Sequence, residues 1–162
     1  MIRRLIFSVA VIAALGLVAG TAAYAAGGSN DTTTDATPKD AEYKMAKKAV
    51  NNKDWKQAIA LLTKVVVRDE ENADAYNFLG YSYRKSGNPE QALTYYKMAL
   101  QIDPKHKGAH EYIGEAYLET GNLKMAEEHL KALDNLCLFG CQEFTDLKKA
   151  VKAYKKIHNI SS

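Results

Sequence analysis

The stretch that decides the fold runs from Ala73 to His106 and reads ADAYNFLGYSYRKSGNPEQALTYYKMALQIDPKH. Its aromatic, apolar and small residues follow a fixed order: Tyr76, Leu79, Gly80, Tyr83, Ala92, Tyr96, Ala99 and Pro104. The next stretch of equal length, 107–140, returns residues of similar kinds in the same phase: His110, Ile113, Gly114, Tyr117, Ala126, Leu130 and Leu133. The preceding stretch, 39–72, returns small and apolar ones: Met45, Ala46, Ala49, Ala58, Leu62 and Val65. Because both shifts land in phase without an insertion, the sequence predicts three consecutive repeats.

This order of residue types resembles the tetratricopeptide repeat (TPR), a helix–turn–helix unit with the same period. The resemblance covers residues 39–138, and the three repeats in phase are 39–72, 73–106 and 107–140. It implies an all-α fold, an α-solenoid whose helix pairs stack into a right-handed superhelix. The composition is that of an ordinary globular protein, since 47% of the 162 residues are hydrophobic and 25% are charged.

The junction between the two helices of each repeat carries local signals of its own. The residue before the second helix is a good N-cap in every repeat: Asp54, Asn88 and Asn122. In two repeats a glycine precedes the cap and suits a left-handed helix end: Gly87 and Gly121. Two further glycines recur where we expect the two helices of a repeat to pack closely: Gly80 and Gly114. Trp55 begins the second helix of repeat one, and we expect it to pack there.

Residues 141–158 predict a capping helix after the third repeat, and residues 159–162 a short tail. Apolar residues recur at helical spacing: Phe144, Leu147, Val151 and Tyr154. Five lysines face elsewhere: Lys148, Lys149, Lys152, Lys155 and Lys156. The simplest interpretation of these lysines is a solvated face, and an acidic partner is the sharper alternative.

Cys137 and Cys141 are the only cysteines, and Gly140 breaks the helix between them. A bend there predicts a disulfide, whereas cysteines at this spacing within one regular helix would be poorly placed for a bond. A ring of this size stabilises a protein by roughly 2 kcal/mol in the chain-entropy model. A thiol or metal site is the alternative, but the spacing differs from the C-x2-C of redox motifs and no further ligands lie nearby.

The N-terminal segment 1–25 predicts a cleaved signal peptide of bacterial type. Arg3 and Arg4 form a positive region, Leu5 to Leu17 an apolar one, and Ala23-Tyr24-Ala25 a cleavage site. An uncleaved membrane anchor is the alternative, because this segment is almost long enough to span a bilayer. Residues 26–38 are rich in Gly, Ser, Thr, Asn and Asp, and we expect a flexible linker.

Export predicts a periplasmic or secreted protein with no stable membrane insertion after cleavage. The whole chain has a formal net charge of +3, with 22 basic and 19 acidic residues. Cleavage removes two arginines and leaves 20 basic residues against 19 acidic ones, a net charge of +1. This charge is too small for a nucleic-acid footprint, so we expect no nucleic-acid partner.

The sequence holds none of the common catalytic motifs: no nucleophile elbow, no phosphate-binding glycine loop and no H-E-x-x-H zinc motif. His106 and His110 are close in the chain, but Pro104 and an expected helix start lie around His106, so we do not expect the two on one helical face. His110 stands where TPRs place an aromatic residue, so we expect it to pack. We therefore predict no enzyme, no metal site and no cofactor.

The resemblance implies that the first helix of each repeat lines a concave groove. On that face we expect partner-binding residues: Tyr43, Lys47, Asn77, Tyr81, Arg84, Glu111, Glu115 and Glu119. Tyr43 and Lys47 replace the Lys and Asn of the clamp by which chaperone-binding TPRs hold two carboxylates. Lys47, Asn77 and Arg84 remain candidates to contact a carboxylate of a partner.

Glu111, Glu115 and Glu119 form one helical stripe, and like charges at this spacing cost about 0.2–0.5 kcal/mol per pair. Internal ion pairs with Lys149 and Lys152, or with Arg84 and Lys85, would compensate them. A basic segment of a partner would do so equally. Tyr43, Tyr81 and Tyr112 would add aromatic contact area, although Tyr112 also suits simple packing.

These features favour a non-catalytic adaptor of the bacterial cell envelope, which holds a peptide or helix of another protein in the concave TPR groove. The alternative is a scaffold that self-associates into a homo-oligomer by end-to-end stacking of repeats.

Overall fold

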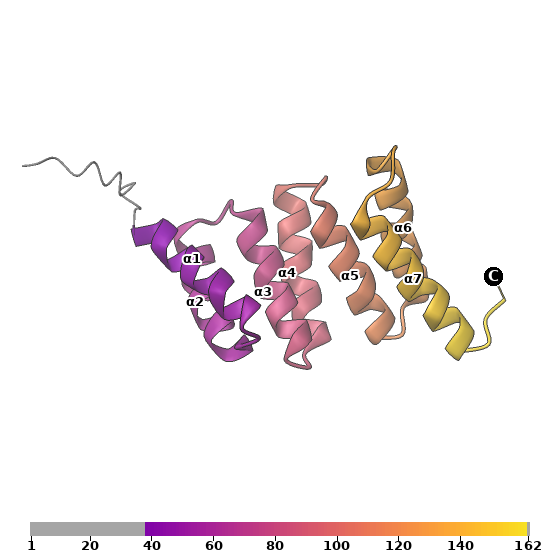
Figure 1. The fold of residues 1–162 in the computed structure, drawn as a ribbon, viewed down its shortest axis with the longest axis horizontal. Coiled ribbons are helices and arrows are strands. Elements are labelled where there is room, and N and C mark those ends of the chain that lie inside the picture. The colour runs from indigo at the N-terminus through magenta and orange to yellow at the C-terminus, as the bar shows by residue number, and fades with distance from the viewer. Residues whose placement is uncertain (1–37, 162) are drawn as a thin grey trace, which may run out of the picture. The chain divides into compact units, whose positions relative to one another are not determined.

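A computed structural model of the chain describes residues 38–161, all of them helix, turn or loop. Within this part lie seven helices: α1 (Pro38–Asn51), α2 (Trp55–Arg68), α3 (Ala73–Lys85), α4 (Pro89–Ile102), α5 (Lys107–Glu119), α6 (Leu123–Leu136) and α7 (Gln142–Ile157) (Figure 1). The predicted signal peptide and residues 26–37 of the linker lie outside the described residues, and α1 already begins at Pro38. None of these seven helices has the length and apolar character that crossing a membrane requires.

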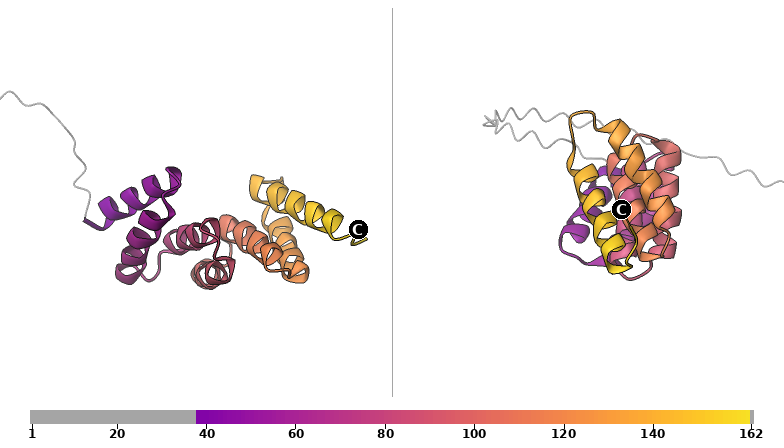
Figure 2. Two further views of the ribbon diagram at one scale, coloured as in Figure 1. Left: turned by 90° about the horizontal axis from the view of Figure 1, so that it is seen from below. Right: turned by 90° about the vertical axis from the view of Figure 1, so that its right-hand side faces the viewer.

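The helices pack as three consecutive pairs, α1 with α2, α3 with α4 and α5 with α6, followed by α7. The prediction of an all-α fold with three TPR-like pairs and a capping helix is confirmed. Along the array α1 contacts α3, α3 contacts α5 and α5 contacts α7, whereas α2, α4 and α6 do not contact one another. The first helices of the pairs therefore lie closer together than the second ones, and the left-hand view of Figure 2 shows them on one side. We call this side the inner face.

Two of the three predicted N-caps form in the structure. The N–H of Gln57 donates to Asp54 at 3.0 Å, and the N–H of Met125 donates to Asn122 at 3.2 Å. Asn88 occupies the N-cap position of α4 as predicted, but its side chain makes no capping bond and its amide instead donates to the carbonyl and hydroxyl oxygens of Ser86.

The turn inside each repeat uses a left-handed backbone conformation. Gly87 and Gly121 have φ values of +87° and +79°, as predicted for glycines that end a helix. Lys53 occupies the same position in the first repeat and has a φ of +59° despite its side chain. The packing of the pair therefore overrides a local preference of roughly 1–2 kcal/mol against this conformation.

Close helix packing explains Gly80 and Gly114, although the two glycines meet different neighbours. A Cβ atom at Gly80 would lie 2.7 Å from the ring of Tyr96 on α4, the second helix of the same repeat, as predicted. A Cβ atom at Gly114 would lie 2.6 Å from Leu147 on α7. The side chain nearest to Gly114 is thus on the capping helix. Leu147 is fully buried where α7 packs on α5.

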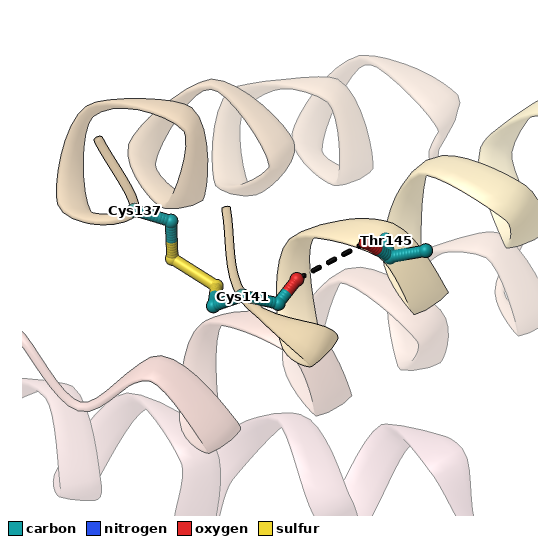
Figure 3. Close-up of a disulfide and its surroundings, with 3 residues drawn as sticks. All are labelled: Cys137, Cys141 and Thr145. Atoms are coloured by element: carbon teal, nitrogen blue, oxygen red, sulfur yellow. Dashed lines mark hydrogen bonds between the residues drawn. A yellow bond between two sulfur atoms is a disulfide. The ribbon is translucent and has the colours of Figure 1, made fainter. Parts of the chain in front are cut away.

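The predicted disulfide is present and joins the end of α6 to the start of α7 (Figure 3). Cys137 is the C-cap of α6 and Cys141 the N-cap of α7, with their Cα atoms 5.6 Å apart. Gly140 makes the bend with a φ of +84°, and its N–H donates to the carbonyl oxygen of Cys137 at 2.8 Å. The disulfide therefore constrains the short connection on which the direction of α7 depends.

Candidate functional site

The inner face carries an open pocket of about 310 Å³ that is built by all three repeats. We call it the aromatic pocket, and it is lined by Val50, Asn51, Lys53, Trp55, Phe78, Tyr81 and Tyr112. These residues come from α1, from the turn and start of α2, from α3 and from α5. Because no single repeat supplies the walls, the pocket exists only when the repeats are stacked.

Tyr81 is the centre of the pocket's aromatic side chains. Its ring lies 5.9 Å from that of Trp55, edge to face, and 5.0 Å from that of Tyr112. Burial raises the pKa of Tyr112 to about 12, and the neighbouring Glu111 adds to this effect. Tyr112 therefore stays a neutral phenol at physiological pH, and the pocket has an aromatic wall that also carries hydroxyl groups.

Two lysines of the inner face lie over tyrosine rings, one of them in the pocket. The ammonium group of Lys85 lies 5.4 Å from the centre of the Tyr81 ring, and that of Lys47 lies 5.0 Å from the Tyr43 ring. Both lysines are exposed. Such contacts hold a lysine near an aromatic face while its charge remains accessible to an acidic group.

Arg84 lies behind the pocket and is almost completely buried. Only 4% of its side chain is exposed, and its guanidinium carbon lies 5.7 Å from the rings of both Tyr81 and Tyr112. Its two terminal nitrogens form ion pairs with Glu115 at 2.5 Å and with Glu119 at 2.8 Å. Arg84 on α3 therefore ties two carboxylates of α5 to the pocket wall.

Glu111 is buried beside this network without a cation of its own among the ion pairs of the described residues. Burial raises its pKa to about 7, and the nearby carboxylates of Glu115, Asp146 and Glu143 contribute to the rise, while Arg84 opposes it. Near neutral pH this carboxyl is therefore only partly ionised.

The comparison with protein families identifies the repeat itself. The tetratricopeptide repeat family model matches residues 73–106. The chain is a TPR repeat protein. No curated protein matches its sequence.

Solved structures share this TPR fold at low sequence identity. The type III secretion translocator chaperone SycD of Yersinia enterocolitica has a TM-score of 0.66 at 20% identity, over 74% of this chain and 84% of that one. The Sgt2 TPR domain from Aspergillus fumigatus has a TM-score of 0.67 at 22% identity, over 76% of this chain and 81% of that one. PcrH in complex with the chaperone binding region of PopD has a TM-score of 0.63 at 18% identity, over 74% and 90%. The TPR domain is thus similar in structure to chaperones, one of them bound to a segment of its partner.

The structure divides the predicted TPR groove residues into accessible and buried ones. Lys47 and Glu119 are exposed, and Tyr43, Tyr81 and Glu115 are half-buried. The other three are at most 8% exposed: Asn77, Arg84 and Glu111. We predicted that Arg84 could contact a carboxylate of a partner. The structure contradicts this prediction, because the guanidinium of Arg84 is buried and already paired inside the domain.

The negative charge of the glutamate stripe is compensated within the domain, but Arg84 is the one predicted cation that pairs with it among the described residues. Arg84 pairs with Glu115 and Glu119. No ion pair of the described residues joins the stripe to Lys149 or Lys152, and both are exposed. The α7 helix instead brings Glu143 and Asp146 near Glu111, so its lysine-rich side faces away from α5.

Of the seven residues that line the aromatic pocket, only Tyr81 belongs to the predicted set of partner-binding residues. Lys53, Trp55 and Phe78 were not expected to contact a partner. A signal for one of them exists in the sequence, because Phe78 and Tyr112 are aromatic residues at the same phase of consecutive repeats. Trp55 packs near the first turn as expected, but its ring also forms a wall of the pocket.

The two histidines do not form a shared site. His106 caps α5 by accepting from the N–H of Ala109 at 3.1 Å, and its other nitrogen lies 3.0 Å from Asp74. His110 donates to the carbonyl oxygen of Pro104 at 3.0 Å and packs against His129. In the part of the chain that the structure describes, no group of three or more His, Cys, Asp or Glu residues could hold a metal ion.

Replacing Glu111 with glutamine is expected to stabilise the protein at pH 8 by roughly 1–2 kcal/mol and to leave its stability at pH 5 nearly unchanged. The folded-state pKa of about 7 lies above the ordinary value of 4.5. Between pH 4.5 and 7 Glu111 is mostly protonated in the folded state and mostly ionised in the unfolded state. The free energy of unfolding therefore falls as the pH rises through this window. Urea unfolding at both pH values checks this, and an equal gain at both would contradict the assigned cause.

Proposed function

We propose that this TPR protein is a non-catalytic adaptor that holds a peptide or helix of a partner protein on its inner face. The observation that carries the proposal is the aromatic pocket, to which all three repeats contribute. A mostly apolar hollow with a few polar groups is the usual form of a binding site. Tyrosine and tryptophan are also the residues in which binding energy concentrates at protein interfaces.

The charges around the pocket indicate what the bound segment would carry. An apolar or aromatic side chain would enter between Trp55 and Tyr81, which are half-buried. Lys85 is exposed beside the ring of Tyr81, and the exposed Lys53 lines the pocket, so an acidic residue beside that anchor would be favoured. Arg84 would act indirectly, by fixing Tyr81 and Tyr112 in place.

The proposed location is the bacterial cell envelope or the space outside the cell. The N-terminal sequence supports it, with its basic start, apolar stretch and cleavage pattern. The bond between Cys137 and Cys141 supports it independently, because disulfides persist in oxidising compartments.

Self-association by end-to-end stacking is less favoured by the charges at the two ends. A hollow of about 240 Å³ at the first pair is lined by Met45, Leu61 and Lys48, among others. The hollows at α6 and α7 are lined by several lysines, including Lys148 and Lys152. Stacking these ends would bring like charges together, which opposes association. Light scattering across a range of concentrations distinguishes a monomer from such a polymer.

Tyr81→Ala is expected to weaken capture of the partner at least about tenfold, because the residue stands at the centre of the pocket. The mature protein is used to recover partners from its own envelope fraction, and the affinity of the recovered segment is then measured for each variant. Tyr95→Ala is the matched control, since Tyr95 is also half-buried but stacks on Tyr83 between α3 and α4. Equal affinity of wild type and Tyr81→Ala would refute the pocket as the binding site.

A further inference from the structure

In repeats two and three, corresponding positions of the first helix face the second helix. Tyr83 of α3 stacks on Tyr95 of α4 with 5.1 Å between the ring centres, and Gly80 faces Tyr96. One repeat later, Tyr117 of α5 stacks on His129 of α6 at 5.7 Å. The positions of Tyr83 and Tyr117 therefore mark where the second helix of a TPR packs, whereas Gly114, at the phase of Gly80, faces Leu147 of α7.

On α7 no second helix of the described residues packs on the equivalent positions. A shift by one further repeat takes His110, Gly114 and Tyr117 to Phe144, Lys148 and Val151. These three line two adjoining hollows of about 380 and 310 Å³, which share Leu130 and Lys148. We call the two hollows together the end groove. No described helix covers it, and in the right-hand view of Figure 2 α6 and α7 face the viewer.

We propose that the end groove binds an acidic amphipathic helix of a partner protein, which packs on α7 as α4 packs on α3 and α6 packs on α5. This is a second surface, separate from the aromatic pocket, and it does not depend on the peptide-binding role of the inner face. The bound helix would complete a fourth TPR.

The floor of the groove fits the apolar side of such a helix. Leu130 of α6 and Phe144 of α7 are half-buried, and Val151 is buried beside them. Phe144 stands at the phase of His110, whose ring lies 5.2 Å from that of His129 on the second helix α6. The apolar surface here is therefore the one that the repeat pattern normally covers with a helix.

The rim of the groove determines the charge of the partner. Four lysines line it: Lys131, Lys148, Lys152 and Lys155. The two acidic residues on the rim compensate them only in part, since Glu127 is already paired with Lys155 at 2.7 Å and Asp134 remains. The excess of positive charge would attract carboxylates and repel a basic helix.

Lys148 explains why the occupant would be a charged helix and not a copy of α4. It stands at the phase of Gly80 and Gly114, where a small residue permits close contact. Its ammonium group lies 5.2 Å from the centre of the Phe144 ring, so the side chain lies across the groove. A helix that packs here must accommodate this side chain, and a carboxylate would pair with it.

The test uses the full chain and a synthetic helical peptide with leucines on one side and glutamates on the other. A second peptide carries lysines in place of the glutamates. NMR titration should show that the acidic peptide perturbs Leu130, Phe144 and Val151, while the lysine peptide does not bind. Lys148→Glu together with Lys152→Glu should weaken binding at least about tenfold. The control pair Lys149→Glu and Lys156→Glu makes the same charge change at exposed sites outside the groove, and should weaken binding by less than about twofold.

Several outcomes would overturn the proposal. Equal losses in the two double variants would show attraction to net charge alone, without a groove. Perturbation of Trp55 and Tyr81 instead would place the peptide in the aromatic pocket. Failure of the acidic peptide to bind the full chain would mean that the groove is closed or already filled by the chain itself. A dimer in sedimentation that disappears with Lys148→Glu would make a second copy the occupant.

Discussion

Replacing Arg84 with methionine is expected to lower the free energy of unfolding by about 3–5 kcal/mol, which is the usual cost of removing one member of a buried ion pair. The side chain is only 4% exposed and pairs with both Glu115 and Glu119. Methionine would fill much of the same space but would leave these carboxylates without their cation. Glu111, whose pKa is already raised to about 7, would also lose the charge that opposes this rise. Urea unfolding at pH 7 measures the loss.

Arg68→Met is the matched control, because Arg68 pairs with Glu42 at a site where its side chain is 55% exposed. Exposed pairs contribute about 0–1 kcal/mol, so this variant should remain close to wild type. Adding Glu115→Gln to Arg84→Met should restore part of the lost stability, since it removes one of the unpaired charges. Similar losses for Arg84→Met and Arg68→Met would show that burial does not make the Arg84 pairs stronger.

The repeat period was sufficient to predict the fold. Small residues recur once per repeat where helices meet, and Gly87 and Gly121 have the left-handed conformation that their position predicted. Local signals were less reliable than the period. Asn88 does not cap α4 because Ser86 offers its side chain competing acceptors. Lys53 takes a glycine-like conformation because the stacked pair imposes it.

The inner face was predicted in outline, but the burial of its charged residues was not. The glutamate stripe indicated a row of carboxylates that needs a cation, and several cations lay at suitable phases. The repeat period does not predict which of these long charged side chains is buried inside the domain. Arg84 does so because α3 and α5 are in contact, which places its guanidinium between two tyrosine rings and beside Glu115.

The capping helix shows the same limitation. Its apolar residues were predicted to pack, and Leu147 and Val151 are buried. The direction of its charged sides depends on the bend at Gly140 and the disulfide, which rotate α7 so that Glu143 and Asp146 approach Glu111. Its lysines then line the end groove, and this places a basic surface where the repeat pattern calls for a helix.

Gly80→Leu is expected to lower the free energy of unfolding by about 3 kcal/mol, the upper part of the range for overpacked cores. Even a Cβ atom at this position would lie 2.7 Å from the ring of Tyr96. The ring cannot move away easily, because Tyr96 is fully buried and lies beside Arg84. The separation of α3 and α4 would have to increase, and the aromatic pocket and the Arg84 pairs would be distorted with it.

Ala60→Leu is the control, because Ala60 is an exposed residue of α2 and the same side chain there meets solvent. Glycine is about 0.8–1.0 kcal/mol less favourable than alanine in a helix, and leucine ranks just below alanine, so intrinsic propensity favours Gly80→Leu and any loss must come from packing. Gly80→Ala should fall between wild type and Gly80→Leu, since it adds one atom at the same contact. If Gly80→Leu instead unfolds at the same urea concentration as wild type, α3 and α4 must be free to separate, and the close contact would not be what positions Tyr81 and Arg84.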